Sequence, residues 1–303
     1  MAFLSNIEYI LGELRTIQDL KSHVEDVEVF EARGLKNYAC YKNNLIELIQ
    51  GVLKKVKPML DKPEKIKYVI FVIDRIDALE KEGYGLETIF NNFLGYIGAP
   101  KAVPFLLSIL ACASTSLALK VACNLINYEN ADEILMVYAN KISANNPRFP
   151  KPEISLLSDG ALAFSVTKDN IYSGFKILAC NHVNDATLND KMKEGYGEFL
   201  ESQIDLCKLA FDASLKKSKV KKENLKKVYF NNYMPHLVKM FYSELGINTE
   251  QQFLENIQRF AHVYSADTFI NLKDNLNQIS SNDRLCLLPN SITSWGSIIL
   301  QKV

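Results

Sequence analysis

The sequence predicts an α/β protein built from two similar halves. Short β-rich runs alternate with longer stretches of helical periodicity, which is the pattern of a parallel or mixed sheet covered by helices. Residues 67–83 and 226–246 both have the pattern of a strand that leads into a helix, and residues 155–166 and 284–300 both have the pattern of two strands around a small-residue turn. This loose repeat predicts that the strand–helix junctions of both halves surround one cleft.

Composition limits the function. The 303 residues, 48% of them hydrophobic, are enough for one large or two medium domains with a sizeable core. Basic and acidic residues number 35 each, so the net charge gives no case for nucleic acid or an anionic membrane as a partner. The first residues lack the basic region and long apolar core of a signal peptide, and no apolar run reaches about 18 residues. We therefore expect a cytoplasmic protein without a membrane span.

The first half, residues 1–167, is expected to begin with an irregular segment. After it, helical or alternating periodicity predicts the remaining elements in turn. They are a helix over 45–60, a strand over 67–73, a helix over 87–96, a buried strand over 104–111, a helix over 117–123, a strand over 133–139 and two strands within 155–167. A proline-rich loop over 145–152 precedes the last pair.

The second half, residues 168–303, repeats the alternation. Its predicted elements are a helix over 190–217, a strand over 228–230, helices over 234–245, 250–260 and 267–276, and strands over 284–288 and 294–300. A run of lysines lies between the first two elements: Lys216, Lys217, Lys219, Lys221, Lys222, Lys226 and Lys227. Such a run is usually a solvated face, and the alternative is a docking surface for an acidic carrier protein.

Cys112 lies where the predicted strand over 104–111 meets the helix that follows. A thiol at the N-terminus of a helix is favoured as the thiolate by the helix dipole, and a thiolate is a nucleophile. The alternative is that Cys112 is an ordinary buried cysteine. The chain has no C-x-x-C pair, so we expect reduced thiols rather than disulfides or a metal site. The other five are expected to be packing residues: Cys40, Cys123, Cys180, Cys207 and Cys286.

Three segments resemble the β-ketoacyl-acyl-carrier-protein synthase III family of the thiolase fold. Residues 110–119 (LACASTSLAL) are similar to the nucleophile segment of the family. Residues 156–164 (LLSDGALAF) are similar to its Gly-Asp-Gly-Ala-Gly-Ala hairpin, and residues 283–300 resemble its C-terminal segment, which ends in Trp-Gly. The resemblance implies a five-layer αβαβα fold, a dimer, and Cys112 as the acyl-accepting cysteine.

The chain departs from the family at the two side chains that accompany this cysteine. The family has a histidine in a His-Gln-Ala-Asn segment, where this chain has Asn231, and an asparagine before a later helix, where this chain has His262. Asn232 replaces Asn231 in this comparison if the alignment is shifted by one residue. Cysteine, histidine and asparagine have thus become Cys112, Asn231 and His262, with the two polar side chains exchanged.

The resemblance implies acyl transfer from a CoA or carrier-protein thioester through an acyl-Cys112 intermediate. Asn231 can donate a hydrogen bond but cannot serve as a base, whereas His262 can take a proton near neutral pH. We therefore predict that His262 activates the acceptor, which is an amine, a hydroxyl, a thiol or a specialised carbon nucleophile; thioester hydrolysis is a weaker option. No bound cofactor or metal is expected, because the thioester is a substrate. A specialised pathway of polyketide or fatty acid type suits such an enzyme.

The main alternative is a catalytically degenerate subunit of a heteromeric ketosynthase-like complex. Asn290, Ser291 and Ile292 stand where the family has a glycine loop, and Trp295 is the only tryptophan, so the CoA-clamping tryptophan of the family has no counterpart. Both interpretations predict a dimer, either with a second copy or with a related chain. Among the remaining histidines, His236 is a further candidate base near the cleft, and His23 and His182 fit no pattern.

Overall fold

The computed structural model describes residues 2–22, 27–80, 85–143, 146–149 and 154–303. The strands are β1 (Ala2–Leu11), β2 (Glu13–Thr16), β3 (Asn37–Cys40), β4 (Ile66–Val72), β5 (Val103–Leu107), β6 (Glu133–Asn140), β7 (Gly160–Thr167), β8 (Phe175–Asn184), β9 (Leu225–Phe230), β10 (Arg284–Leu288) and β11 (Ser294–Lys302). The α-helices are α1 (Val27–Ala32), α2 (Leu45–Val56), α3 (Asp77–Glu80), α4 (Leu86–Ile97), α5 (Ser114–Tyr128), α6 (Leu188–Glu194), α7 (Tyr196–Ser218), α8 (Pro235–Glu244), α9 (Glu255–Phe260) and α10 (Asp267–Asp274). Two short 3₁₀ turns matter for the site, η4 (Ala111–Ala113) and η7 (Tyr264–Ala266).

One mixed sheet of nine strands connects the two halves, in the order β5-β4-β6-β7-β1-β8-β11-β10-β9. Parallel pairs join β4 to β5 and β6 in the first half, and β9 to β10 in the second. β1 pairs with β7 on one side and with β8 on the other, so it links the two halves. The predicted boundary after residue 167 coincides with the end of β7.

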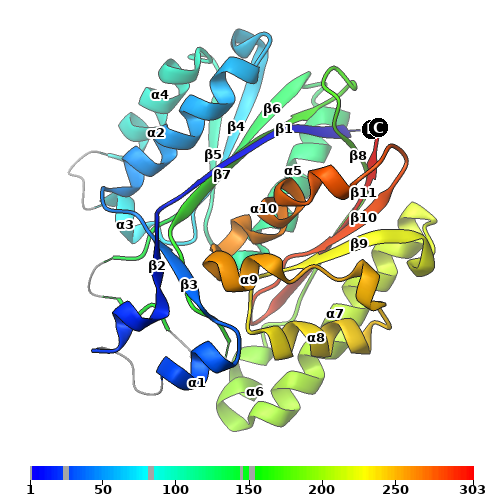
Figure 1. The fold of residues 1–303 in the computed structure, drawn as a ribbon. Coiled ribbons are helices and arrows are strands. Elements are labelled where there is room, and N and C mark those ends of the chain that lie inside the picture. Colours follow the sequence, from blue (N-terminus) through cyan, green and yellow to red (C-terminus); the bar gives the residue numbers. More distant parts are fainter. Residues whose placement is uncertain (1, 23–26, 81–84, 144–145, 150–153) are drawn as a thin grey trace.

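Helices form three layers around this sheet, as Figure 1 shows. α2 and α4 cover the outside of the first half, α7 and α8 cover the outside of the second, and α5 and α10 lie between the halves. The central core joins residues of both halves to the central helices, for example Leu119 of α5, Phe269 of α10, Met136 of β6 and Leu287 of β10. The layers therefore follow the five-layer αβαβα order, and the N-termini of α5 and α10 lie inside the molecule.

Most predicted elements are present with boundaries shifted by a few residues. The helix predicted over 45–60 is α2, whose first turn is capped because the Asn44 side chain accepts a hydrogen bond from the Glu47 amide at 2.8 Å. The single helix predicted over 190–217 is two helices, α6 and α7, with extended backbone at Gly195 between them. No described helix has both the length and the apolar composition needed to cross a membrane.

Three sequence-based expectations are wrong. The N-terminal segment is not irregular, because Ala2–Leu11 forms β1 near the middle of the sheet. The strand predicted as buried over 104–111 is β5, which is shorter, lies at the edge of the sheet and is partly exposed. Residues 155–167 hold one strand rather than two: β7 begins at Gly160, and the residues before it form only an isolated bridge between Leu157 and His262. Half of the proline-rich loop predicted over 145–152 lies outside the described residues, which include 146–149.

Candidate active site

Cys112 lies at the entrance to the central helix α5. It belongs to η4, which continues directly into α5, and only 7% of its surface is exposed. The residue before it, Ala111, has a φ of 45°, a left-handed conformation that alanine rarely adopts. Such strain is commonly kept where it aims a functional side chain. The Thr115 hydroxyl donates to the Ser265 carbonyl at 2.5 Å and so ties the first turn of α5 to the second half.

His262 comes from the second half and lies in the short segment between α9 and η7. Its backbone is held against residues 156–158, because its N–H donates to Leu156 at 3.0 Å and its carbonyl accepts from the Ser158 N–H at 2.8 Å. Ala261 before it and Tyr264 after it also have positive φ angles, 55° and 51°. The backbone around the imidazole is therefore as sharply turned as the backbone before Cys112.

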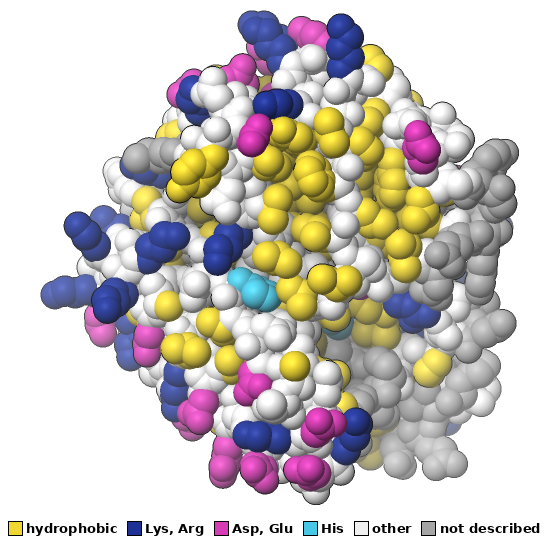
Figure 2. Space-filling model, turned by 180° about the vertical axis from the view of Figure 1, so that it is seen from behind, with side chains coloured by type: hydrophobic (Ala, Val, Ile, Leu, Met, Phe, Trp, Pro, Cys, Tyr) yellow, Lys and Arg dark blue, Asp and Glu magenta, His cyan; other side chains and the backbone are white. Residues whose placement is uncertain are grey.

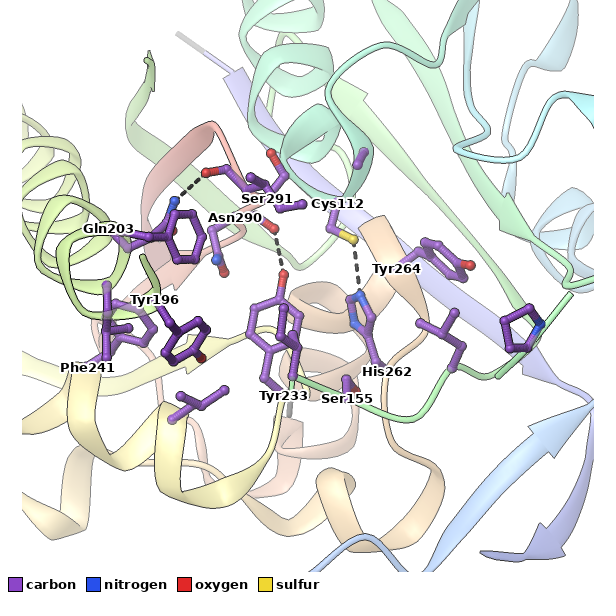
Figure 3. Close-up of a pocket in the computed structure, with 18 of the residues that line it drawn as sticks. Cys112, Ser155, Tyr196, Gln203, Tyr233, Phe241, His262, Tyr264, Asn290 and Ser291 are labelled. Atoms are coloured by element: carbon purple, nitrogen blue, oxygen red, sulfur yellow. Dashed lines mark hydrogen bonds between the residues drawn. The ribbon is translucent and has the colours of Figure 1, made fainter. Parts of the chain in front are cut away.

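Two of the three side chains predicted to be catalytic, Cys112 and His262, meet in the structure. The Nε2 atom of His262 is 3.1 Å from the Sγ atom of Cys112, as Figure 3 shows. On the other side of the ring, Nδ1 contacts Oδ2 of Asp267, the first residue of α10, which is fully buried. A carboxylate can only accept there, so Nδ1 carries the proton and the Nε2 lone pair faces the sulfur. Cys112, His262 and Asp267 thus form a thiol–imidazole–carboxylate triad, an arrangement that suits a nucleophile with its base.

Asp267 is fixed by hydrogen bonds from two backbone amides. The N–H of Val263 donates to Oδ1 at 2.6 Å, and the N–H of Asn232 donates to Oδ2 at 2.7 Å. The Asn232 side chain in turn donates to the Ala261 carbonyl at 2.9 Å. These bonds hold the carboxylate, and through it the imidazole, in one orientation. Asn232 therefore supports the base rather than contributing a side chain to the cavity.

The expectation that the helix dipole favours the thiolate of Cys112 is wrong. Burial raises the pKa of the Cys112 thiol well above its ordinary value, and the nearby carboxylates of Asp74 and Asp267 raise it further. The Tyr233 hydroxyl acts in the opposite direction but does not outweigh them. Cys112 therefore rests as a thiol, and its proton has to pass to His262 when the sulfur attacks.

Asn231 lies one layer behind Cys112 and His262. It is 1% exposed, and its amide nitrogen donates to the Tyr233 hydroxyl at 3.2 Å and to the Asn290 carbonyl at 3.1 Å. Asn231 is not among the residues that line the cavity, whereas Tyr233 and Asn290 are. The structure thus brings Cys112 and His262 together, but it places Tyr233 between Asn231 and the cavity.

A cavity of about 540 Å³ opens onto the triad. In Figure 3, Cys112, His262 and Tyr264 lie on one side of the view, Tyr233 and Asn290 lie in the middle, and Tyr196, Gln203 and Phe241 lie on the other side. The rest of the wall is mainly apolar and includes Ile154, Leu157, Phe199, Leu200, Leu237 and Ile292. Among the described lining residues there is no aspartate or glutamate, and Arg75 is the only lysine or arginine. A cavity of this kind suits an apolar substrate with one reactive polar group.

The comparisons with known proteins agree with this architecture. Residues 109–186 match the family model of 3-oxoacyl-[acyl-carrier-protein] synthase III. Among solved structures, 3-oxoacyl-[acyl-carrier-protein] synthase III from Aquifex aeolicus VF5 is similar at 18% identity, with a TM-score of 0.79 over 99% of this chain and 100% of that one. ChlB3, described as an acyltransferase, is similar at 14% identity and a TM-score of 0.84 over 100% of this chain and 98% of that one.

A third similar structure is OleA from Xanthomonas campestris with bound lauric acid and lauroyl-CoA, at 12% identity and a TM-score of 0.80 over 99% of this chain and 98% of that one. No curated protein sequence matches the chain. The chain has the thiolase fold of the 3-oxoacyl-[acyl-carrier-protein] synthase III enzymes. At these identities the structural likeness shows the fold alone, and the family-model match covers the nucleophile segment around Cys112.

Two residues of this thiolase-fold site were missed by sequence reasoning. Asp267 stands five positions after His262, at the start of a helix that the sequence did predict, so an acidic residue at a helix N-terminus near a candidate base was the available signal. Tyr233 occupies the third position of the segment that is His-Gln-Ala-Asn in the family, where an alanine has become a large side chain that can donate a hydrogen bond.

The remaining candidates lie away from the triad. His236 is exposed on α8 and does not line the cavity. His182 is half-buried on β8, where its Nδ1 is 2.8 Å from the Ser116 hydroxyl, and His23 lies outside the described residues. Cys40 and Cys123 are half-buried, Cys180, Cys207 and Cys286 are buried, and all five are free thiols. Among the described residues, no group of three or more metal-ligating side chains is placed to hold a metal ion.

Proposed function

We propose that this protein transfers an acyl group from a CoA or carrier-protein thioester to a nucleophilic acceptor through an acyl-Cys112 thioester. The observation that carries the proposal is the 3.1 Å contact between Cys112 Sγ and His262 Nε2, with Asp267 on the far side of the ring. The family-model match around the nucleophile segment and the acyltransferase name of ChlB3 support the same class of chemistry.

The triad can perform both half-reactions with one base. In the first, Sγ of Cys112 attacks the donor carbonyl while its proton passes to Nε2 of His262, and the donor thiolate leaves and receives that proton. In the second, the acceptor gives its proton to Nε2 as it attacks the acyl group, and the Cys112 thiolate leaves and is protonated again. Asp267 stabilises the imidazolium that forms in each step.

An amine, hydroxyl or thiol acceptor fits this site better than a malonyl thioester. The resemblance implies that decarboxylative condensation needs two donors aimed at one carbonyl. Here the amide hydrogens of Asn231 are engaged by Tyr233 and by the Asn290 carbonyl, and His262 faces the sulfur as a base. Misplacing one such donor costs about 10²–10³ in rate. The site therefore favours acceptors that carry a proton for His262 to remove.

Intact-mass measurement tests the acyl-enzyme. The wild-type protein is incubated with acyl-CoA and acyl-carrier thioesters of increasing chain length, and we expect one acyl adduct that is absent from Cys112→Ala. Cys180→Ala is the matched control, because Cys180 is buried on β8 at the same 7% exposure, and it should retain the adduct. Absence of an adduct with every donor, or equal adducts on wild type and Cys112→Ala, contradicts the proposal. Acceptors are then identified by which amine, alcohol or thiol discharges the adduct.

The alternative is a non-catalytic subunit that pairs with an active thiolase-fold chain. The altered segment Asn290-Ser291-Ile292 at the cavity wall favours it, because the family has a glycine loop there. Co-purification with a second thiolase-fold chain, together with an absence of acyl adduct on this chain, would establish this role.

We also propose that a second copy, or a related chain, pairs along β5. In the described part of the chain β5 is bonded only to β4, while its side chains Val103 and Phe105 are 49% and 39% exposed and Ile109 just beyond it is 82% exposed. The face turned away from the viewer of Figure 1 carries a broad area of apolar side chains, as Figure 2 shows. An open apolar edge strand is otherwise an aggregation hazard.

Solution mass tests the pairing. The double variant Val103→Lys/Phe105→Lys should convert a dimer to a monomer, because two buried charges would face each other across the paired edges. Leu209→Lys is the matched control, since Leu209 is a similarly exposed apolar residue on α7, at 58%. A monomeric wild type, or a dimer that survives the double variant, contradicts pairing along β5.

A further inference from the structure

Tyr233 places a second polar group beside the reactive sulfur. Its ring packs edge-on against the His262 ring, with 5.0 Å between the centroids, and the side chain lines the cavity. This hydroxyl lowers the pKa of the Cys112 thiol, against the larger opposite effect of burial. The imidazole and the phenol therefore lie against each other in the wall of the cavity that also holds Cys112.

The Tyr233 phenol can redirect its donated hydrogen bond from the Asn290 carbonyl to a new acceptor. The hydroxyl donates to the Asn290 carbonyl at 2.9 Å and accepts from the Asn231 amide at 3.2 Å. The same carbonyl also accepts from Asn231 at 3.1 Å. If the phenol turns its proton to a substrate, the Asn290 carbonyl keeps the Asn231 amide as a donor, so that carbonyl is not left without a partner. Burial also raises the pKa of the Tyr233 phenol well above its ordinary value, which keeps it protonated.

We infer that Tyr233 is a catalytic hydrogen-bond donor to the thioester carbonyl oxygen as the tetrahedral intermediate forms on Cys112, and that Asn231 positions it. This inference rests on the proposed acyl transfer. Position 231, where the family has a histidine, here carries an asparagine that donates to the hydroxyl of a cavity-lining tyrosine two residues later. The Asn231 amide holds the phenol oxygen and the Asn290 carbonyl together, so that the phenol proton points along the cavity wall.

Tyr264 provides a matched comparison within the same cavity. It also lines the wall and also stacks on the His262 ring, with 5.4 Å between the centroids. Its hydroxyl interacts with Arg75 rather than with Asn231 and Asn290. In Figure 3 the Tyr264 ring extends away from Asn290, whereas the Tyr233 hydroxyl points to it. Removing each hydroxyl in turn therefore separates donation at the carbonyl from packing against the imidazole.

The experiment compares acyl-adduct formation by wild type, Tyr233→Phe and Tyr264→Phe over time with one acyl-CoA. We expect Tyr233→Phe to acylate about 10²–10³-fold more slowly with little change in KM, because it loses one oxyanion donor. Tyr264→Phe measures the cost of removing a hydroxyl from the cavity wall without removing that donor, and it should slow acylation at least about tenfold less than Tyr233→Phe. Asn231→Ala should lie between them. The pH profile of Cys112 alkylation by iodoacetamide adds a second readout: it should move to higher pH in Tyr233→Phe, since the phenol lowers the thiol pKa against the larger effect of burial.

The outcomes are distinguishable. Wild-type acylation with an equally fast Tyr233→Phe overturns the role of Tyr233 and leaves the proposed acyl transfer intact. Equal slowing in both phenylalanine variants overturns it as well, because the effect would then come from packing against His262. No adduct on the wild-type protein with any donor overturns the proposed acyl transfer and the role of Tyr233 with it.

Discussion

The two central helices, α5 and α10, begin in similar ways in the two halves. Each begins at a buried residue in the interior of the molecule, and each follows a short 3₁₀ turn. Each is also preceded by a candidate catalytic side chain that follows an alanine of positive φ, Cys112 after Ala111 and His262 after Ala261. The sulfur before α5 and the imidazole before α10 thus come within 3.1 Å of each other.

The difference between the helices assigns the roles. The first turn of α5 carries neutral hydroxyls, Ser114, Thr115 and Ser116, whereas α10 begins with the carboxylate of Asp267. A carboxylate against an imidazole stabilises the imidazolium, so the proposed mechanism assigns the base to the second half. Burial and the carboxylates of Asp74 and Asp267 raise the pKa of the Cys112 thiol, so the first half supplies a protonated thiol as the proposed nucleophile. Cys112 and His262 thus hold corresponding positions before α5 and α10, but only His262 is followed by a helix that begins with a carboxylate, Asp267.

Removing the charge of Asp267 is expected to have the largest effect on the rate of acyl transfer. Asp267→Asn should slow acyl transfer by about 10²–10⁴, because the amide no longer fixes the Nδ1–H tautomer or stabilises the imidazolium. The same change should lower the pKa of Cys112, since burial is the main cause that raises it but the Asp267 carboxylate adds to the shift. Iodoacetamide alkylation of Cys112 should therefore begin at lower pH while acyl transfer falls. Slow transfer without the alkylation shift would mean that the loop around His262 had moved instead.

Asp274→Asn is the matched control for this variant. Asp274 ends the same helix and pairs with Arg259 at 2.6 Å and with the Tyr9 hydroxyl at 2.7 Å, away from the cavity. Its loss should lower stability but leave the alkylation profile of Cys112 in place. A profile that shifts equally in both variants would contradict the special role given to Asp267.

The variant Asp74→Asn tests the first half in the same way, and its expected effect on acyl transfer is smaller. Oδ2 of Asp74 accepts from the Ser265 hydroxyl at 2.6 Å and from Asn140 at 3.0 Å. Burial raises the pKa of the Asp74 carboxyl, and these hydrogen bonds oppose the shift. Asp74→Asn should move alkylation of Cys112 to lower pH, because the Asp74 carboxylate is, next to burial, a cause of the raised thiol pKa. Acyl transfer should change by less than about tenfold, since His262 and Asp267 remain. Transfer that falls as far as in Asp267→Asn would place Asp74 in the triad chemistry itself.

Periodicity predicted the elements that position the site, and local sequence could not predict the contacts between them. The helical pattern over 45–60 and the β-rich run over 67–73 became α2 and β4, because one apolar face or a short apolar run decides each element locally. The segment 2–11 was missed because its strand pairs with β7 and β8, which lie far away in sequence.

The same limit applies to the candidate site. Cys112 and His262 could be selected from the resemblance. The positive φ angles of Ala111 and Ala261, which precede them, could not be predicted, because alanine rarely adopts that conformation. The ionisation state of Cys112 was predicted with the wrong sign because the helix dipole is visible in sequence, whereas burial and two carboxylates from distant segments are not. The resemblance therefore identified the candidate residues, and tertiary packing decides the protonation of Cys112.

The smallest effect is expected from the lysine run over 216–227. Lys222 and Lys227 already donate to the carbonyls of Leu245 at 3.1 Å and Gln252 at 2.9 Å, and the run lies at the far end of α7 from the cavity. Twenty helical residues separate the two ends by about 30 Å, roughly three Debye lengths at 0.1 M salt. Reversing the charges of Lys216, Lys217 and Lys219 should therefore change transfer from acyl-CoA by less than about twofold. A salt-sensitive loss with a carrier-protein donor alone would make this run the carrier-docking surface, and unchanged rates with both donors would exclude that role.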